Sequence, residues 1–580
     1  MKKKIFILLS IFVLGLTITL CIINIKDNKT NISYKEENID WSKYETKEIE
    51  LTESLTITNP GIYILSGKIT GSVTINTSDY VKLILNGVEI TNNDGPAIMI
   101  ENSKKTYIEL NENTTNILTD NGNSENDGVI YSKDDLVITG TGTLEITANN
   151  QDGIVSKDSL VIENGNINIT SIDDGIRGKD FVTILNGNIN ISSTGDGIKA
   201  TNEKDTSLGY ILIENGNITI NSKQDGIQAA TNIKILDGTF KITTGNGSTT
   251  TSKNSSAWGK INNSTDTVSK KAIKADNDII INGGTFEIDS EDDSIHSNNN
   301  IEINTGTYTL STGDDGIHAD TNLTIKDGKI DITKSYEGLE ASVITIDNGQ
   351  ISIIASDDGI NVAGGSDSSS LNRPGENNFD TNTSYILTIN DGYIYVNADG
   401  DGLDSNGKII MNGGTVLVDG PTNDGNGALD YETEFIINGG TLVAVGSSGM
   451  AEVISSNSTQ NGVLINFENS YEENTIINID GIITYSPSKK FSSIVVSTKN
   501  IKLNESYNIT IGGEATGTVK NGLYVDGTYS GGNLYQTYTQ SSVATTIGNK
   551  MNGNPGMGPD NNQRPGEPPE RRWKIFFFVL

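Results

Sequence analysis

The stretch STGDDGIHAD, residues 311–320, sets two aspartates against a glycine and an isoleucine. Near-copies of this acidic corner recur along the chain: SIDDGIRG (171–178), SKQDGIQA (222–229), SEDDSIHS (290–297), ASDDGINV (355–362) and ADGDGLDS (398–405). Gly153, Gly175 and Gly197 fill the glycine position in three successive copies and lie 22 residues apart. A motif that returns at a short fixed period is typical of a solenoid, in which each repeat packs on its neighbours.

Short alternating segments separate the corners, for example LVIENGNINIT (160–170) and LTIKDGKIDIT (323–333). Alternation of apolar and polar residues predicts strands with one buried face, and a second glycine in most repeats predicts another corner. The expected fold is therefore all-β: a right-handed parallel β-helix with rungs of about 22 residues, spaced by ~4.8 Å, and β caps at both ends.

The departures from this period predict the domain limits. We expect the β-helix over 45–450, with surface-loop insertions at about 243–270 and 365–384, because these two stretches are rich in Ser, Thr, Asn and Gly. Residues 451–545 are expected to form a C-terminal β cap. The Gly- and Pro-rich segment 546–580 is expected to be disordered.

The N-terminus has the pattern of a targeting segment. Lys2, Lys3 and Lys4 precede Ile5–Ile25, a run of 21 residues without charge. Residues 1–25 are expected to be either a signal peptide or a membrane anchor acting through residues 5–25, followed by a linker over 26–44. Either role predicts an exported bacterial protein, extracellular or at the cell surface. Cys21 is the sole cysteine, so no intramolecular disulfide supports the exported part.

The charge of the chain limits its partners. The formal net charge is −33 over 580 residues. Such a chain repels polyanions, so nucleic acid is not expected as a partner, and an anionic partner would need a bridging cation.

The acids are concentrated at one corner of the repeat. The residue before the first glycine is acidic in almost every repeat, whereas the residue before the second glycine is mostly Asn, Gly or Thr. Stacked carboxylates about 5 Å apart would repel by roughly 3 kcal/mol at an effective dielectric of 20. A bound Ca²⁺, which accepts six to eight oxygen ligands, would reverse that penalty. For isolated acids such as Asp152 and Asp225, ordinary Asp-Gly turn chemistry is the simpler explanation.

Repeats with paired acids are the better candidates for metal ligands. The predicted ligands are Asp173, Asp174, Asp292, Asp293, Asp314, Asp315, Glu337, Glu340, Asp357, Asp358, Asn361, Asp399, Asp401 and Asp404.

The residue after the corner Ile or Leu forms a second predicted column. From the N-terminal side it reads Arg177, Lys199, Gln228, Lys274, His296, His318, Glu340, Asn361, Asp404 and Asp430. Such residues either contact a ligand or decorate a solvated face. The predicted carbohydrate contacts are Arg177, Lys199, Lys274, His296, His318, Tyr393, Tyr395 and Tyr431, with Trp258 as a further aromatic candidate, because sugar faces stack on aromatic rings.

Three of these segments together resemble a known family. The DDGI corners, SYEGLEAS (335–342) followed by ASDDGINVAGG (355–365), and DGDGLDSNG (399–407) are similar to the bacterial β-helix carbohydrate-binding family. The resemblance spans about residues 45–545 and includes the insertion before KKAIKAD (270–276). It implies a right-handed parallel β-helix, calcium at the acidic turns, and binding of an extracellular polysaccharide, either an acidic pectate-like polymer or cellulose.

Two other functions stay open. The family's fold is similar to that of calcium-dependent pectate lyases, in which a Lys or Arg removes a proton. Arg177, Lys199 and Lys274 are the candidate bases for that reaction. A structural adhesin, in which calcium only stiffens the solenoid, is the second alternative.

Overall fold

The computed structural model describes residues 32–35, 37–121, 125–249, 268–363 and 384–549. The predicted targeting segment, Trp258, most of both insertions and nearly all of the C-terminal tail lie outside these residues. Within them, no helix is long and apolar enough to cross a membrane.

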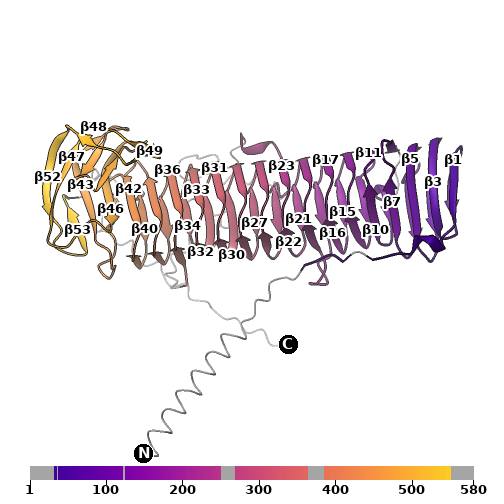
Figure 1. Cartoon of the computed structure of the whole chain (residues 1–580), viewed down its shortest axis with the longest axis horizontal. Coiled ribbons are helices and arrows are strands. Elements are labelled where there is room, and N and C mark those ends of the chain that lie inside the picture. The colour runs from indigo at the N-terminus through magenta and orange to yellow at the C-terminus, as the bar shows by residue number, and fades with distance from the viewer. Residues whose placement is uncertain (1–31, 36, 122–124, 250–267, 364–383, 550–580) are drawn as a thin grey trace, which may run out of the picture.

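The described chain is an elongated rod of strands that cross its long axis (Figure 1). Its only helical elements among the described residues are two 3-10 turns, η1 (Trp41–Lys43) and η2 (Gly247–Thr249). One sheet contains 45 strands, and nearly all of its pairings are parallel. The all-β, parallel expectation is confirmed.

The strands of this sheet stack in three columns, which we name A, B and C in the order of the strands within one repeat, such as β12, β13 and β14. Column A contains β2 (Leu55–Ile57), β4 (Val73–Asn76), β6 (Ile98–Asn102), β9 (Gly128–Ser132), β12 (Asp152–Ser156), β15 (Ile176–Gly178), β18 (Ile198–Ala200), β21 (Ile227–Ala229), β24 (Ile273–Ala275), β27 (Ile295–Ser297), the first part of β30 (Ile317–Ile325), the first part of β32 (Leu339–Ile346), β34 (Ile360–Val362), β37 (Leu403–Ser405) and β40 (Leu429–Tyr431).

Column B contains β1 (Thr46–Leu51), the first parts of β3 (Gly61–Thr70) and β5 (Val81–Asn92), β7 (Thr106–Leu110), β10 (Leu136–Gly140), β13 (Ser159–Ile162), β16 (Phe181–Ile184), β19 (Tyr210–Ile213), β22 (Ile233–Ile235), β25 (Ile279–Ile281), β28 (Asn300–Ile303), the second parts of β30 and β32, β35 (Ile386–Ile389), β38 (Lys408–Met411) and β41 (Glu434–Ile437).

Column C contains the second parts of β3 and β5, β8 (Thr115–Asp120), β11 (Thr143–Ala148), β14 (Asn166–Ser171), β17 (Asn188–Ser193), β20 (Asn217–Ser222), β23 (Thr239–Thr244), β26 (Thr285–Ser290), β29 (Thr307–Thr312), β31 (Lys329–Ser335), β33 (Gln350–Ala355), β36 (Tyr393–Ala398), β39 (Thr415–Asp419) and β42 (Thr441–Gly446).

The register places equivalent residues of successive repeats side by side. Ile154 pairs with Ile176, and Ile176 pairs with Ile198. Residues from all three columns, such as Ile154, Ile162 and Ile169, share one buried apolar core. The corner glycine is required by the neighbouring turn: a Cβ on Gly197 would lie 2.5 Å from the carbonyl oxygen of Gly226.

The C-terminal end of the stack is covered by strands that pair mostly in antiparallel fashion. β42 pairs with β46 (Phe491–Thr498), which pairs with β43 (Gly462–Tyr471), and β53 (Ala544–Ile547) joins β43. A second sheet has the order β49 (Thr518–Lys520), β50 (Leu523–Val525), β45 (Ile483–Tyr485), β44 (Ile477–Ile479), β47 (Ser506–Ile511) and β52 (Asn533–Thr539). A separate pair joins β48 (Glu514–Ala515) to β51 (Tyr529–Ser530). A second apolar core joins this region to the outer face of column C, through Tyr395 and Leu417.

Candidate functional site

The acidic corner joins column C to the following strand of column A, and its aspartates link successive turns. Oδ1 of Asp152 accepts a hydrogen bond from the backbone N–H of Asp174 at 2.9 Å. The same bond recurs from Asp196 to Asp174, Asp225 to Asp196, Lys271 to Asp225, Asp315 to Asp293, Glu337 to Asp315 and Asp401 to Asp358. One carboxylate oxygen of each of these accepting aspartates therefore has a structural partner, which leaves the other oxygen for a counter-charge.

The second predicted column is real, because the strand register pairs its members in order. Arg177 pairs with Lys199, Lys199 with Gln228, Gln228 with Lys274, and so on through His296, His318, Glu340, Asn361, Asp404 and Asp430. These residues flank the corner acids, so their identity decides how each stretch of the acidic corner is neutralised.

In the N-terminal stretch the second column is basic. Nε of Arg177 donates to Oδ2 of Asp152 at 2.8 Å, and Arg177 also forms an ion pair with Asp127. Nζ of Lys199 lies 2.6 Å from Oδ2 of Asp196. Lys274 is farther from its acid, with 3.9 Å between its Nζ and Oδ2 of Asp225. Side-chain cations already occupy positions where a metal ion would compensate these acids.

These contacts also bear on the candidate bases for a lyase reaction. Although burial opposes it, Asp152 and Asp127 raise the pKa of the Arg177 guanidinium. Burial likewise opposes the charged form of Lys199, but Asp196 and Asp174 raise its pKa. A general base must be able to lose its proton near the working pH. Both side chains instead hold their protons more firmly than usual.

The predicted pair Asp173 and Asp174 lies in this stretch. Together with Asp152 these two residues offer oxygens within 4.8 Å of one another. Burial raises the pKa of Asp174 to about 7, and Asp196 adds to the rise. The nearby Arg177 and Lys199 make this group a weaker cation site than its acids alone suggested.

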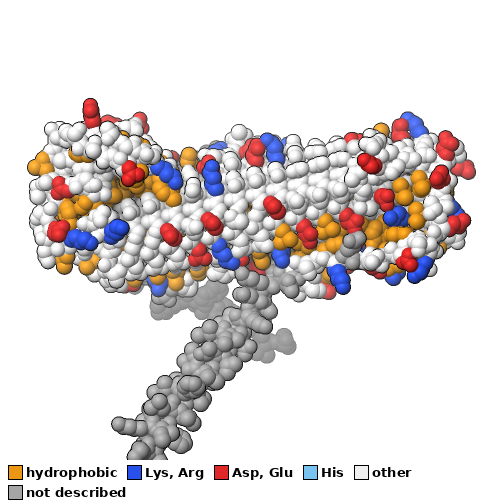
Figure 2. Space-filling model, viewed as in Figure 1, with side chains coloured by type: hydrophobic (Ala, Val, Ile, Leu, Met, Phe, Trp, Pro, Cys, Tyr) orange, Lys and Arg blue, Asp and Glu red, His pale blue; other side chains and the backbone are white. Residues whose placement is uncertain are grey.

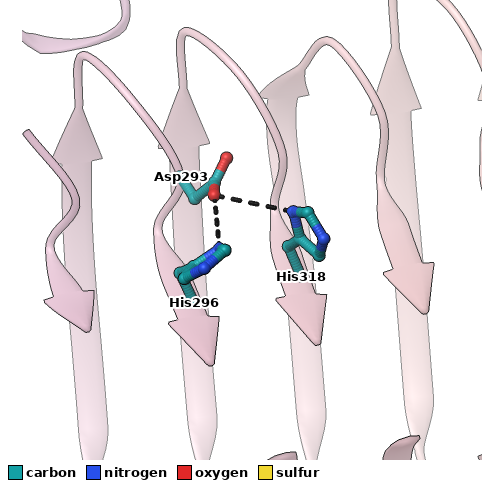
Figure 3. Close-up of side chains that lie close together, drawn as sticks. All are labelled: Asp293, His296 and His318. Carbon is teal, nitrogen blue, oxygen red and sulfur yellow. Dashed lines mark hydrogen bonds and ion pairs between the residues drawn. The ribbon is translucent and has the colours of Figure 1, made fainter. Parts of the chain in front are cut away.

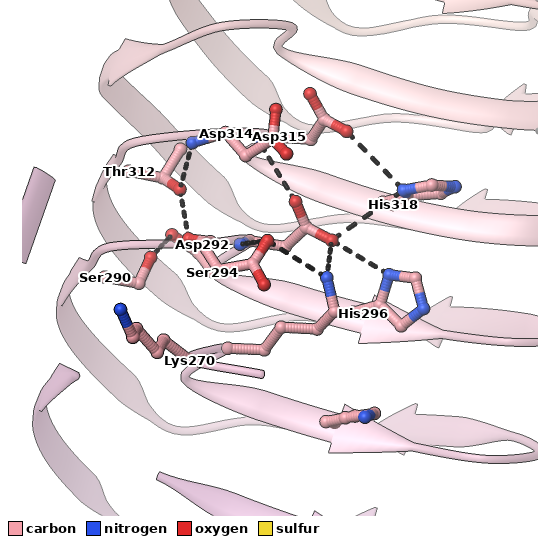
Figure 4. Close-up of polar contacts among 12 residues, drawn as sticks. Lys270, Ser290, Asp292, Ser294, His296, Thr312, Asp314, Asp315 and His318 are labelled. Atoms are coloured by element: carbon pink, nitrogen blue, oxygen red, sulfur yellow. Dashed lines mark hydrogen bonds and ion pairs between the residues drawn. The ribbon is translucent and has the colours of Figure 1, made fainter. Parts of the chain in front are cut away.

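In the middle stretch, one carboxylate oxygen of Asp293 lies close to three nitrogen atoms. Figure 3 shows the two that belong to His296 and His318, and Figure 4 shows the polar contacts around these two histidines. Oδ2 of Asp293 lies 2.7 Å from Nζ of Lys271, 2.9 Å from Nδ1 of His296 and 3.7 Å from Nδ1 of His318. Despite burial, Lys271 and the two histidines hold the pKa of Asp293 well below its usual range. Lys271 also contacts Asp292 at 3.1 Å. The sequence did not predict this role, because Lys271 stands at the corner position where most repeats have an acid.

The two histidines lie within the acidic corner rather than on an open surface. His296 and His318 are 0% and 2% exposed, and their rings meet edge to face with centroids 4.8 Å apart. Nδ1 of His318 lies 3.5 Å from Oδ2 of Asp315 and 3.4 Å from Oε2 of Glu340. Burial opposes the imidazolium, but Glu340, Asp315 and Asp293 raise the pKa of His318 well above its usual range. The prediction of sugar contacts at these two residues disagrees with their burial.

The C-terminal stretch is acidic in both columns. Glu337, Asp358 and Asp401 form the corner, and Glu340, Asn361 and Asp404 flank it. Oxygens of Asp358, Asp401 and Asp404 lie within 4.8 Å of one another. In the part of the chain that the structure describes, no lysine or arginine forms an ion pair with Glu337 or with these three aspartates.

Asn361 adds a second kind of observation to this stretch. Its Nδ2 donates to Oε2 of Glu337 at 2.8 Å. Its Oδ1 is buried and has no hydrogen-bond partner among the described residues. Asn361 stacks between Glu340 and Asp404 in the register, so this amide oxygen belongs to the acid cluster. Amide and carboxylate oxygens are the ligands that Ca²⁺ prefers.

The protonation of this stretch reflects its uncompensated charge. Burial raises the pKa of Asp404 to about 8, with Asp401 and Asp430 adding to the rise. Burial raises the pKa of Glu340 to about 8, and His318 only partly opposes it. Burial and neighbouring acids also raise the pKa values of Glu337 and Asp358 well above their usual range. The cluster therefore retains protons that a bound cation would displace.

The remaining predicted ligands lie at the rim of the corner. Asp292, Asp293 and Asp314 form a group with oxygens close together, although Lys271 contacts two of its members. Asp399 is exposed and pairs with Lys489 of the C-terminal region at 2.7 Å. Asp357 is half-buried and lies beside Tyr336.

The predicted tyrosine platform is occupied by protein. The hydroxyl of Tyr395 donates to Asp419 at 3.0 Å, and the ring belongs to the second apolar core. The hydroxyl of Tyr393 donates to the carbonyl of Lys520, whose Nζ lies 3.4 Å from the centroid of the Tyr393 ring. The hydroxyl of Tyr431 donates to the carbonyl of Val453. These rings dock the C-terminal region onto the stack, which disagrees with a role in sugar stacking.

Comparisons with known proteins agree with part of this interpretation. A family model described as carbohydrate-binding domain-containing protein matches residues 52–316. A carbohydrate-binding domain-containing protein of Acetivibrio thermocellus is 33% identical over 159 residues, which cover 25% of this chain and 53% of that protein. The chain thus spans about half the length of this curated relative. The match confirms the resemblance to a carbohydrate-binding family for residues 52–316, and the acids from Glu337 to Asp404 lie beyond it.

A solved structure, described as the gadolinium derivative of a polysaccharide lyase-like protein from C. thermocellum, is 32% identical to this chain. The likeness covers 36% of this chain and 86% of that one, with a TM-score of 0.33.

Proposed function

We propose that this chain is an exported protein that binds polysaccharide through calcium held at its acidic corner. The preferred ligand is an acidic, pectate-like polymer, and cellulose is the second candidate. The scaffold in this proposal is a closed, right-handed β-helix with rungs of about 22 residues. The match to a carbohydrate-binding family over residues 52–316 supports the ligand class.

The observation that carries the calcium proposal is the acid cluster of the C-terminal stretch. Asp358, Asp401 and Asp404 bring their oxygens within 4.8 Å of one another without an ion-paired lysine or arginine among the described residues. The donor set consists of carboxylates and Oδ1 of Asn361, which has no partner among the described residues. Such a set fits Ca²⁺ and is unsuited to Zn²⁺, which favours His and Cys.

The exposure of this cluster suggests how it would meet a ligand. Asp358 and Asp401 are half-buried, whereas Asp315, His318 and Glu340 are buried. A cation held by the half-buried acids would keep coordination positions open toward solvent, where the carboxylates of a uronate polymer could complete them. The acidic side chains would then hold the cation, and the cation would make the local charge attractive to an anionic polymer.

We further propose that the protein is not a lyase. The contacts of Arg177 and Lys199 with corner acids support this proposal, because they favour the protonated side chains. The apolar run Ile5–Ile25 is proposed to remain as a membrane anchor that holds the protein at the cell surface.

Co-sedimentation tests the function directly. The purified chain is mixed with insoluble polygalacturonate or cellulose, in calcium or in chelator, and the supernatant is assayed for unsaturated sugar. Calcium-dependent capture without product is the expected result. Release of unsaturated product would make the protein a lyase, and no capture on either polymer would favour the structural adhesin.

A further inference from the structure

The N-terminal segment that precedes the first strand packs along the outside of column B. Residues 32–35 and 37–43, which we call the strap, follow the rod beneath its N-terminal half (Figure 1, indigo). Trp41 meets the ring of Tyr107 edge to face at 5.5 Å, and Nζ of Lys82 lies 4.9 Å from the centroid of the Trp41 ring. Glu37 forms an ion pair with Lys105 at 3.5 Å. The stretch expected as a linker is therefore largely a fixed part of the rod.

The strap covers an apolar stripe on the outer face of column B. Tyr107, Val137 and Val161 form a buried cluster against which Tyr34, Ile39, Trp41 and Phe181 pack. Figure 2 shows hydrophobic side chains gathered along the lower side of this half of the molecule. Burial of these side chains on both partners holds the strap in place, since each Å² of apolar surface removed from water contributes about 25 cal/mol.

The strap begins near the middle of the rod. Nζ of Lys234, on β22, donates to the carbonyl oxygen of Ile32 at 3.2 Å, and the Ile32 side chain is buried. Among the described strands of column B, eight steps separate β22 from β1 and seven separate it from β41. At ~4.8 Å a step, the two ends of the column are roughly 38 and 34 Å away.

The sequence before the strap limits the distance to the membrane. Six residues, 26–31, lie between the end of the uncharged run at Ile25 and Ile32. Even fully extended, the seven steps from Ile25 to Ile32 span at most about 25 Å. With an anchor formed by residues 5–25, the distance from the bilayer to the middle of the rod would thus be shorter than the distance from the middle of the rod to either end.

From this geometry we propose that the rod is mounted broadside on a lipid bilayer, with column B toward the lipid. The proposal rests on the retained anchor of the proposed function. The acidic corner joins columns C and A and takes no part in column B. Broadside mounting therefore turns the acidic corner away from the membrane, toward the medium in which a polysaccharide would be met.

Fluorescence energy transfer from labels on the rod to labelled lipid tests the broadside orientation. The full chain with Cys21→Ser is reconstituted into phosphatidylethanolamine and phosphatidylglycerol vesicles that contain an acceptor-labelled lipid. A donor is placed on Glu50→Cys at one end of the rod or on Glu473→Cys at the other. We expect similar transfer from both ends. At roughly 4.8 Å a strand, a rod that stood end-on would hold one donor more than 50 Å farther from the bilayer than the other. Transfer from the more distant donor would then be abolished.

A second pair of labels in one turn tests which side faces the lipid. Lys179→Cys lies between columns A and B, and Ile172→Cys lies at the acidic corner; both sites are exposed. The Lys179 label is expected to transfer more efficiently. Equal or reversed efficiencies would overturn the proposed orientation.

A variant of the strap tests whether the strap is what orients the rod. The double variant Ile39→Ala with Trp41→Ala is expected to detach the strap from column B, so that the anchor is joined to the rod at β1 instead of near β22. Energy transfer from Glu50→Cys should then exceed that from Glu473→Cys. Ser42→Ala, on the exposed side of the strap, is expected to keep the two ends equal. Recovery of the mature chain without residues 5–25 would overturn the mount. Polysaccharide capture by co-sedimentation, which needs no membrane, would be unaffected by any of these outcomes.

Discussion

Oδ1 of Asp196 accepts a hydrogen bond from the backbone N–H of Asp225 at 2.8 Å, while its Oδ2 lies 2.6 Å from Nζ of Lys199. One side chain thus joins two turns and meets a counter-charge. The carboxylates of the acidic corner therefore have two separable roles. The first oxygen binds the backbone of the next turn, whereas the partner of the second oxygen depends on which side chains lie beside it. In the stretch from Glu337 to Asp404 those neighbours are other acids.

The structural task predicts a stability difference between two substitutions. Asp196→Ala leaves the buried N–H of Asp225 without its acceptor and is expected to cost about 1–3 kcal/mol in urea unfolding. Asp196→Asn keeps an oxygen at that position and should cost less. Asp327→Ala is a matched control, since Asp327 is exposed and accepts bonds only from the N–H of its neighbour Gly328 and, at 3.4 Å, from Nδ2 of the exposed Asn348. Equal losses for Asp196→Ala and Asp327→Ala would contradict the interpretation.

The raised pKa values predict how stability depends on pH. Asp401 at about 6, and Glu340 and Asp404 at about 8, bind protons more tightly in the folded chain than in the unfolded chain. Their contribution to stability is therefore present below pH 4 and is lost as the pH rises from about 4 to 8.

In chelator, Tm is expected to fall between pH 5 and pH 8. Calcium, which would replace the protons, should raise Tm most at pH 8 and reduce the slope. Scanning calorimetry at four pH values, with and without calcium, measures both effects. A Tm that rises with pH in chelator would show that these acids are not held in the protonated form.

A separate prediction concerns the junction with the C-terminal region. Asp419 is buried and accepts bonds from the hydroxyls of Tyr485 at 2.7 Å, Tyr395 at 3.0 Å and Ser488 at 2.6 Å. Asp419→Ala removes the acceptor from these three hydroxyls and from the backbone N–H of Ser488. It is expected to destabilise the region by several kcal/mol, which would appear as faster proteolysis after β42. Asp391→Ala, an exposed acid on the neighbouring turn, should be silent. Unchanged proteolysis of Asp419→Ala would mean that the apolar core alone holds this junction.

Much of this architecture follows from local rules that the sequence displays. The repeat of Gly153, Gly175 and Gly197 predicts the stack, and alternation predicts which side chains enter the core. The order of the second column, from Arg177 to Asp430, is reproduced by the strand register, because parallel pairing of equal turns leaves each residue beside its equivalent.

The rest depends on contacts between segments that no local pattern encodes. Tyr393 and Tyr395 face outward from column C, as alternation requires, but the C-terminal region covers them. The strap joins Ile32 to Lys234 across 202 positions of the sequence. Lys271 neutralises the acids of the next turn, since its long side chain reaches along the axis to Asp293. For Tyr393 and Tyr395, the sequence therefore allowed a role on an open surface that the C-terminal region takes away.

Calorimetric titration of calcium into the purified chain tests the central claim most directly. Wild type is compared with Asp358→Asn combined with Asp404→Asn, which removes charge from the uncompensated stretch but keeps the oxygen that binds the N–H of Asp401. Asp196→Asn, from the stretch served by Lys199, is the matched control. We expect at least one calcium site in wild type and in the control, proton release on binding at pH 7, and loss of that site in the double variant. Calcium binding of equal stoichiometry and affinity in the double variant would contradict the account.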